Sequence, residues 1–135
     1  MNHLSIEELL EELRRRRWVV YIFGPREEPH ACAAVFQWET CADVIILRGE
    51  ERATAFRVTT LAETDVFQPA LVSWQYHSTA DWTLRAVLTI PAPGELAAPI
   101  QLLQPHPDCV IPLDARNPVT ILPANGAKKA DQGDP

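Results

Sequence analysis

Four runs of β-branched and aromatic residues follow one another early in the chain, and they constrain the fold more than any other feature. Turn-forming residues separate these runs, as expected for short strands joined by tight connections. Two similar runs come later, split by the polar segment STAD. The six runs cover residues 18–23, 31–38, 43–48, 52–60, 71–77 and 82–90. We therefore expect six strands in a mainly antiparallel sheet.

Residues 4–17, LSIEELLEELRRRR, precede the first run and have the pattern of an amphipathic helix. Ser5 and Glu8 have the spacing of a capping box, which satisfies backbone donors at a helix start. The glutamates lie toward the N-terminal end of this helix, where the helix dipole is positive, and the arginines lie toward its negative C-terminal end. The sequence predicts an α+β fold in which this N-terminal helix packs on the sheet.

Two of the expected strands are apolar at consecutive positions, which is typical of strands covered on both faces. They contain VVYIF at residues 19–23 and VIIL at residues 44–47. The N-terminal helix can cover one face of the sheet. The other face must be covered by the C-terminal part of the chain or by a second protein, and we expect a homo-oligomer or a subunit of an assembly.

Nine of the twelve prolines lie from Pro91 onward. Proline lacks a backbone donor and interrupts helices and central strands. We expect an extended arm over residues 91–123, with an edge strand as an option, within a single domain of residues 1–123. Residues 124–135 have no large apolar side chain and are predicted to be a disordered tail.

The stretch LVSWQYHSTADWTLRAVL, residues 71–88, concentrates aromatic side chains around a polar break. Read as a hairpin, alternation puts Trp74, Tyr76 and Trp82 on one face as core neighbours. The opposite face would carry Arg57 and Arg85 into solvent.

Charge and composition exclude several functional classes. The net charge of −6 opposes general binding to nucleic acid. The longest apolar runs are too short to cross a bilayer, and the N-terminus is unlike a signal peptide, so we expect a cytoplasmic protein that does not bind membranes. The five glycines form no phosphate-binding loop, and we expect no cofactor.

Cysteine and histidine spacing gives only a weak metal signal. Three cysteines without a CxxC pair suggest free thiols. A Cys2His2 site could form only if His30 and Cys32 met His106 and Cys109 in the fold, and buried thiols are the favoured interpretation. We expect no metal site.

These observations favour a non-catalytic binding or accessory subunit that meets a protein partner, and we assign no catalytic residue. The arginines are the predicted partner contacts: Arg14, Arg15, Arg16, Arg17, Arg57 and Arg85. The alternative is a small-molecule pocket, or a modest enzyme, with an aromatic pocket between helix and sheet. Its predicted ligand contacts are Trp74, Tyr76, His77 and Trp82.

Overall fold

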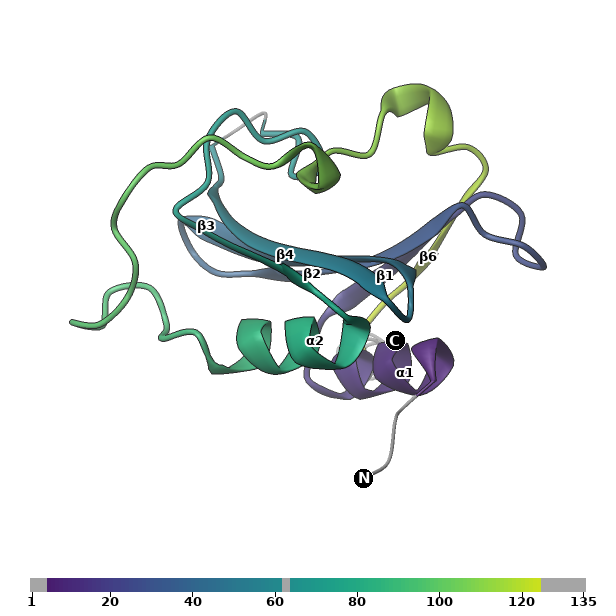
Figure 1. Cartoon of the computed structure of the whole chain (residues 1–135), viewed down its shortest axis with the longest axis horizontal. Coiled ribbons are helices and arrows are strands. Elements are labelled where there is room, and N and C mark those ends of the chain that lie inside the picture. The colour runs from purple at the N-terminus through teal and green to yellow at the C-terminus, as the bar shows by residue number, and fades with distance from the viewer. Residues whose placement is uncertain (1–4, 62–63, 125–135) are drawn as a thin grey trace, which may run out of the picture.

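A computed structural model describes residues 5–61 and 64–124 of the chain. Within these residues the fold is α+β, with a six-stranded antiparallel sheet, two α-helices and two short 3-10 turns. Figure 1 shows their arrangement. The helices are α1 (Ile6–Arg15) and α2 (Ala80–Thr89), and the 3-10 turns are η1 (Pro107–Cys109) and η2 (Leu113–Ala115). The strands are β1 (Val19–Phe23), β2 (Ala31–Gln37), β3 (Cys41–Gly49), β4 (Arg52–Thr59), β5 (Trp74–Ser78) and β6 (Val119–Leu122).

The strand order is β5-β4-β3-β2-β1-β6, and every neighbouring pair is antiparallel. Strands β1 to β5 are therefore a meander, because each pairs with the strand before it. β6 comes from the far end of the chain and pairs with β1. The two edges of the sheet are thus formed by the short strands β5 and β6.

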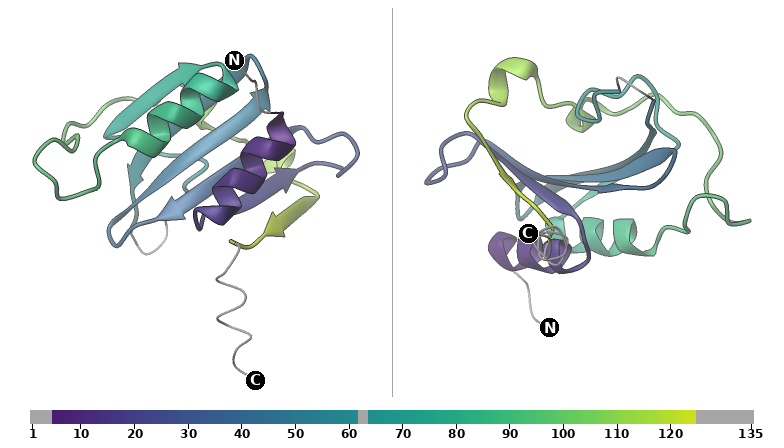
Figure 2. Two further views of the ribbon diagram at one scale, coloured as in Figure 1. Left: turned by 90° about the horizontal axis from the view of Figure 1, so that it is seen from below. Right: turned by 180° about the vertical axis from the view of Figure 1, so that it is seen from behind.

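Both helices lie on one face of the sheet, side by side, as the left view of Figure 2 shows. α1 begins at the predicted capping box, in which Ser5 accepts from the Glu8 amide and Glu8 accepts from the Ser5 amide. Its Leu9 and Leu13 are buried against the sheet. The N-terminal helix packed on a sheet is therefore confirmed.

The prediction of a strand at residues 82–90 is wrong, because this segment is helix α2. Thr79 caps the helix by accepting from the Trp82 amide at 3.3 Å. The buried residues of α2 are Ala80, Thr83, Leu84 and Val87. Their spacing of three and four residues is helical, and it outweighs the looser alternation of every second residue.

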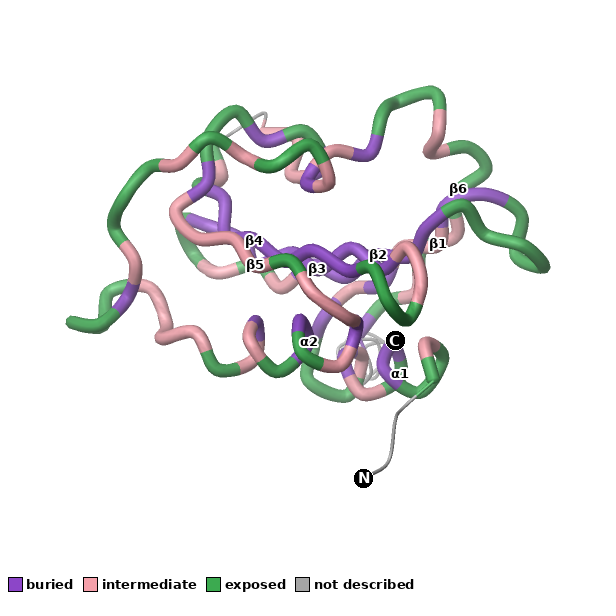
Figure 3. The backbone as a smooth tube through the Cα atoms, viewed as in Figure 1, coloured by how far each residue is buried: buried purple, intermediate pink, exposed green. Residues whose placement is uncertain are grey.

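The opposite face of the sheet is covered by the loop before β5 and by residues 103–115 of the C-terminal arm, visible above the sheet in Figure 1. Apolar side chains from these segments pack against side chains on this face of the sheet, such as Phe56. They belong to Phe67, Val72, Cys109 and Ile111. The prediction of strands covered on both faces is confirmed, and Figure 3 shows the central strands as buried. Because the arm covers this face, the strands that are apolar on both faces need no second protein to bury their side chains.

The arm also supplies the sixth strand. β6 lies within the arm, so the arm does form an edge strand of the sheet. The strand expected at residues 71–77 begins only at Trp74. Val72 forms an isolated bridge to Leu103 and packs on the arm side of the sheet. The predicted tail lies outside the described residues except for Ala124, which is buried.

Candidate functional site

A buried ion pair lies beneath the C-terminal end of α2. Arg57 on β4 is directly opposite Asp43 on β3 and donates from Nε to Oδ1 at 2.6 Å and from Nη2 to Oδ2 at 2.9 Å. Both side chains are almost wholly buried. Trp38 Nε1 donates to the same carboxylate at 2.9 Å, and Arg57 Nη1 donates to the Pro91 carbonyl at 2.8 Å. Arg57 thus ties two strands to the segment that follows α2.

The expectation that Arg57 faces solvent is therefore wrong. Alternation along β4 places Ala53, Ala55 and Arg57 on the helix side, where the helix-side core lies. A guanidinium at such a position needs a partner, and the carboxylate of Asp43 provides one. Because Arg57 is 2% exposed, it is not a surface contact for a partner.

Asp43 also lines a cavity of about 230 Å³, which we call the inner cavity. Three aromatic rings follow one another along it: the Trp18 and Phe36 centroids are 5.7 Å apart, and those of Phe36 and Trp38 are 4.9 Å apart. The full lining is Arg16, Trp18, Phe36, Trp38, Asp43, Val87, Leu88, Ile90 and Ala92. The sheet side thus contributes aromatic rings and a carboxylate, and the α2 side contributes aliphatic side chains.

A second hollow, of about 510 Å³, adjoins the inner cavity at Arg16 and Leu88; we call it the α2 groove. Its lining is Arg16, Tyr76, Trp82, Arg85, Ala86, Leu88 and Thr89. Trp82 is 56% exposed, and the Arg85 guanidinium carbon lies 5.1 Å from its ring centroid. An aromatic ring this exposed, with a guanidinium over its face, is a cation–π pair open to solvent.

Four of the predicted site residues therefore meet in the α2 groove: Arg16, Tyr76, Trp82 and Arg85. Trp74 lies beside them, half-buried against the helix-side core, with its ring stacked on Tyr76 at 6.4 Å. Trp82 was expected in the core and is exposed instead, because helix α2 turns its side chain away from the sheet. Arg85 is exposed, as expected.

The other arginines of the α1 end have local roles. Arg15 and Arg16 both pair with Glu12, and Arg14 donates to the Pro123 carbonyl after β6. Arg17 is exposed and has a φ of 77°, so it occupies the left-handed position that ends the helix. Of the four, Arg16 alone lines both hollows.

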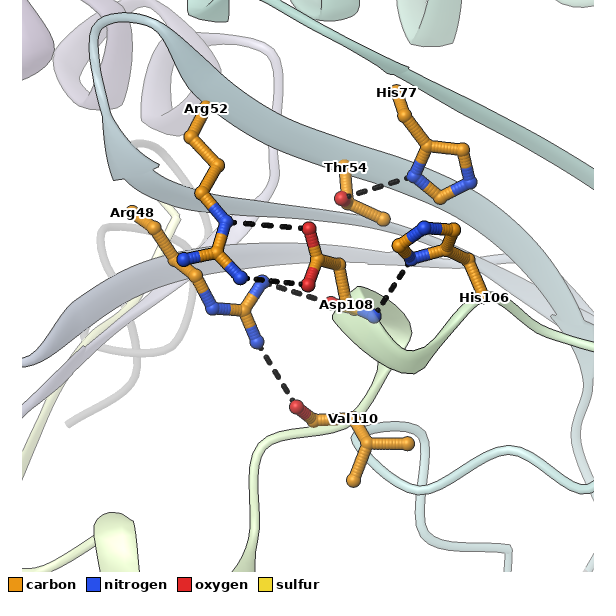
Figure 4. Close-up of polar contacts among 7 residues, drawn as sticks. All are labelled: Arg48, Arg52, Thr54, His77, His106, Asp108 and Val110. Atoms are coloured by element: carbon orange, nitrogen blue, oxygen red, sulfur yellow. Dashed lines mark hydrogen bonds and ion pairs between the residues drawn. The ribbon is translucent and has the colours of Figure 1, made fainter.

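His77 belongs to a different cluster, on the arm side of the sheet, shown in Figure 4. Asp108 of η1 accepts from Arg52 of β4, with Nη2 to Oδ1 at 2.8 Å. Arg48 of β3 donates to the carbonyls of Asp108 and Val110 at 2.8 and 2.9 Å. We call this set the arm latch, and its members are Arg48, Arg52, Thr54, His77, His106 and Asp108. It holds the arm onto the sheet.

Two imidazole rings face each other in the arm latch. The centroids of His77 and His106 are 4.5 Å apart, and His106 Nδ1 accepts from the Asp108 amide. His77 Nδ1 lies 3.1 Å from Thr54 Oγ1. Burial, with the neighbouring His106, lowers the pKa of His77 below its usual value of 6.5. The hydrogen bond from Arg52 lowers the pKa of Asp108, so this carboxylate holds its charge.

The residues considered for a metal site do not come together. Cys32 packs on the helix side of the sheet, whereas Cys109 is buried on the arm side. Within residues 5–61 and 64–124, no three His, Cys, Asp or Glu side chains are grouped to hold a metal ion. All three cysteines are free and buried, and burial raises the pKa of Cys109 to about 11. A thiol of that kind is a poor nucleophile.

The sequence interpretation missed Asp43 as a site residue. The turn at Gly49 does not reveal the pairing, because the register of β3 and β4 shifts at a bulge between Leu47 and Gly49, and Asp43 lies opposite Arg57 only with that shift. The surrounding aromatic residues, Trp18, Phe36 and Trp38, carry no signal either, because the position of α2 decides whether they enclose a cavity.

Comparison with known proteins identifies no relatives: no family model matches the chain, and no curated protein or solved structure resembles it significantly. In the part of the chain that the structure describes, neither helix has the length and apolar character needed to cross a bilayer.

Proposed function

We propose that the protein is a non-catalytic docking subunit that binds a protein partner through the α2 groove. The observation that carries the proposal is the exposed Trp82 with Arg85 over its ring, beside Tyr76 and Arg16. Tryptophan, tyrosine and arginine are the residues that most often dominate binding energy in protein interfaces. The Arg85 guanidinium favours a partner surface that offers carboxylates next to apolar side chains.

The chemistry of the rest of the molecule supports a binding role. The three thiols are buried, and the carboxylate of Asp43 is paired with the Arg57 guanidinium. Neither arrangement resembles an activated nucleophile or a general base. Free cysteines fit a reducing compartment, and we propose a cytoplasmic location. The net charge of −6 supports a protein partner over a nucleic acid.

Affinity capture from the native host tests the docking role. The wild-type chain is compared with the double variant Trp82→Ala, Arg85→Ala, and captured proteins are quantified by mass spectrometry. Leu96→Ala is the matched control, because Leu96 is fully exposed on the arm and lies outside the groove. We expect one captured protein to fall at least tenfold with the double variant and to remain with the control. Equal capture by all three chains would contradict the proposal.

The inner cavity favours a second candidate function, the binding of a small molecule. It places a buried carboxylate beside three aromatic rings in a partly open hollow, and a mainly apolar lining with a few polar groups is the usual composition of a ligand site. It differs from the predicted aromatic pocket, since Tyr76 and Trp82 line the groove and His77 lies on the other side of the sheet. A thermal-shift screen tests this role: stabilisation by one chemical class supports it, and no stabilisation argues against it.

A further inference from the structure

We infer that the inner cavity binds an uncharged, planar aromatic molecule that carries an N–H or O–H donor. The inference rests on the second candidate function and names its ligand class. It does not depend on the docking role of the α2 groove, so the two can fail separately.

The shape of the cavity selects a flat ligand. The rings of Trp18, Phe36 and Trp38 come from the sheet side, whereas Val87 and Leu88 come from α2. A ligand between an aromatic and an aliphatic wall gains most contact when it is planar and apolar. The volume of about 230 Å³ is small. Since a cavity of about 150 Å³ holds benzene in another protein, this one has room for one or two fused rings.

The carboxylate of Asp43 selects for a donor. A carboxylate offers about four acceptor positions. Three are used here, by Arg57 Nε on Oδ1 and by Arg57 Nη2 and Trp38 Nε1 on Oδ2. Oδ1 thus has capacity for one more donor, and Asp43 lines the cavity. A ligand that donates to this oxygen gains a charge-assisted hydrogen bond to a carboxylate that is itself almost wholly buried.

The charged side chains around the cavity are already paired with side chains of opposite charge, and we therefore expect an uncharged ligand. Arg57 neutralises Asp43 through two hydrogen bonds. Arg16, at the opening toward the α2 groove, pairs with Glu12 at 2.8 Å. A charged ligand would lose its hydration without gaining an unpaired counter-ion.

Indole and benzofuran form a matched pair of probes, because they share one shape and differ in the N–H donor. Binding is followed by NMR of the ¹⁵N-labelled protein, in which each of the four tryptophans gives an indole N–H signal. We expect saturable binding of indole with a shift of the Trp38 signal, and at least tenfold weaker binding of benzofuran.

Two variants locate the site. Ala92→Trp places a large ring in the lining of the cavity, at a half-buried position outside the helix, and should abolish indole binding. Ala97→Trp, at an exposed position outside the lining, should leave it unchanged. Equal affinity for indole and benzofuran, no saturable binding of indole, or unchanged binding by a folded Ala92→Trp protein would overturn the inference.

Discussion

Arg57 and Asp43 form a two-point ion pair, with contacts of 2.6 and 2.9 Å, in the interior between β3, β4 and the end of α2. Asp43 lines the inner cavity, and Arg57 donates to the Pro91 carbonyl where the chain leaves α2. The pair therefore ties the segment that follows α2 to the central strands of the sheet.

Removing one member of the pair should destabilise the protein strongly. Arg57→Met leaves the Asp43 carboxylate buried without its counter-ion, and we expect a loss of about 3 kcal/mol in the free energy of unfolding, measured with urea. The double variant Asp43→Leu, Arg57→Met should recover much of that loss, because no charge is then left buried. A double variant as unstable as the sum of the two single ones would contradict this account.

The end of α1 offers a prediction of increased stability. Arg17 has a φ of 77°, and the amides of Arg17 and Trp18 donate to the carbonyls of Arg14 and Leu13. This is the helix ending that favours glycine. Arg17→Gly should raise the free energy of unfolding by about 1 kcal/mol, since it removes the cost of a left-handed side-chain residue.

Arg16 provides the control for the helix end. It precedes Arg17, has a φ of −94° and pairs with Glu12. Arg16→Gly should therefore lower stability, because glycine adds backbone freedom where none is needed. A lower stability of Arg17→Gly than of the wild type in the same urea titration would show that the residue is not left-handed.

The arm latch should make stability depend on pH. The pKa of His77 is lowered in the folded protein by burial and by His106, so the unfolded chain binds the proton more readily. Stability is then complete above the unfolded pKa of 6.5 and falls as the pH drops through 6.5 toward the lower folded pKa. We expect the melting temperature to fall between pH 7.5 and 5.5, and to fall less in His77→Gln. An equal fall in both proteins would mean that protonation of His77 does not cause the loss of stability at low pH.

Cys109 should report on whether the arm is held by Asp108. The thiol is completely buried between the arm and the sheet, and burial raises its pKa to about 11, so iodoacetamide should label it slowly in the native protein. Asp108→Ala removes the acceptor for Arg52 and should increase the labelling rate of Cys109 severalfold. Cys32, on the other side of the sheet, is the internal control. Equal acceleration at both cysteines would indicate general loosening of the fold.

Much of the fold could be predicted from local pattern. The capping box at Ser5, the first four strands and the need for cover on both faces all follow from residue types and spacing. The misreading of residues 82–90 has a specific cause. Leu84 and its neighbours fit both a period of two and a helical period, and the capping role of Thr79 decides between them.

The site was harder to predict because it depends on contacts between distant segments. Tyr76 and Trp82 were expected as neighbours in a hairpin and instead line one groove from a strand and a helix. The pairing of His77 with His106 requires the path of the arm, which proline spacing alone does not specify. The pairing of Arg57 with Asp43 likewise depends on a feature that the sequence does not announce, the bulge between Leu47 and Gly49 that shifts the register of β3 and β4.

Site-specific photo-crosslinking in the native host tests the central claim that the α2 groove docks a partner. p-Benzoylphenylalanine replaces Thr89 in one chain and Leu96 in another, since both positions are exposed, only the first lines the groove, and Trp82 stays in place. We predict one discrete crosslinked protein from position 89 that is absent from position 96. No adduct at position 89, or the same set of adducts at both positions, would contradict the claim.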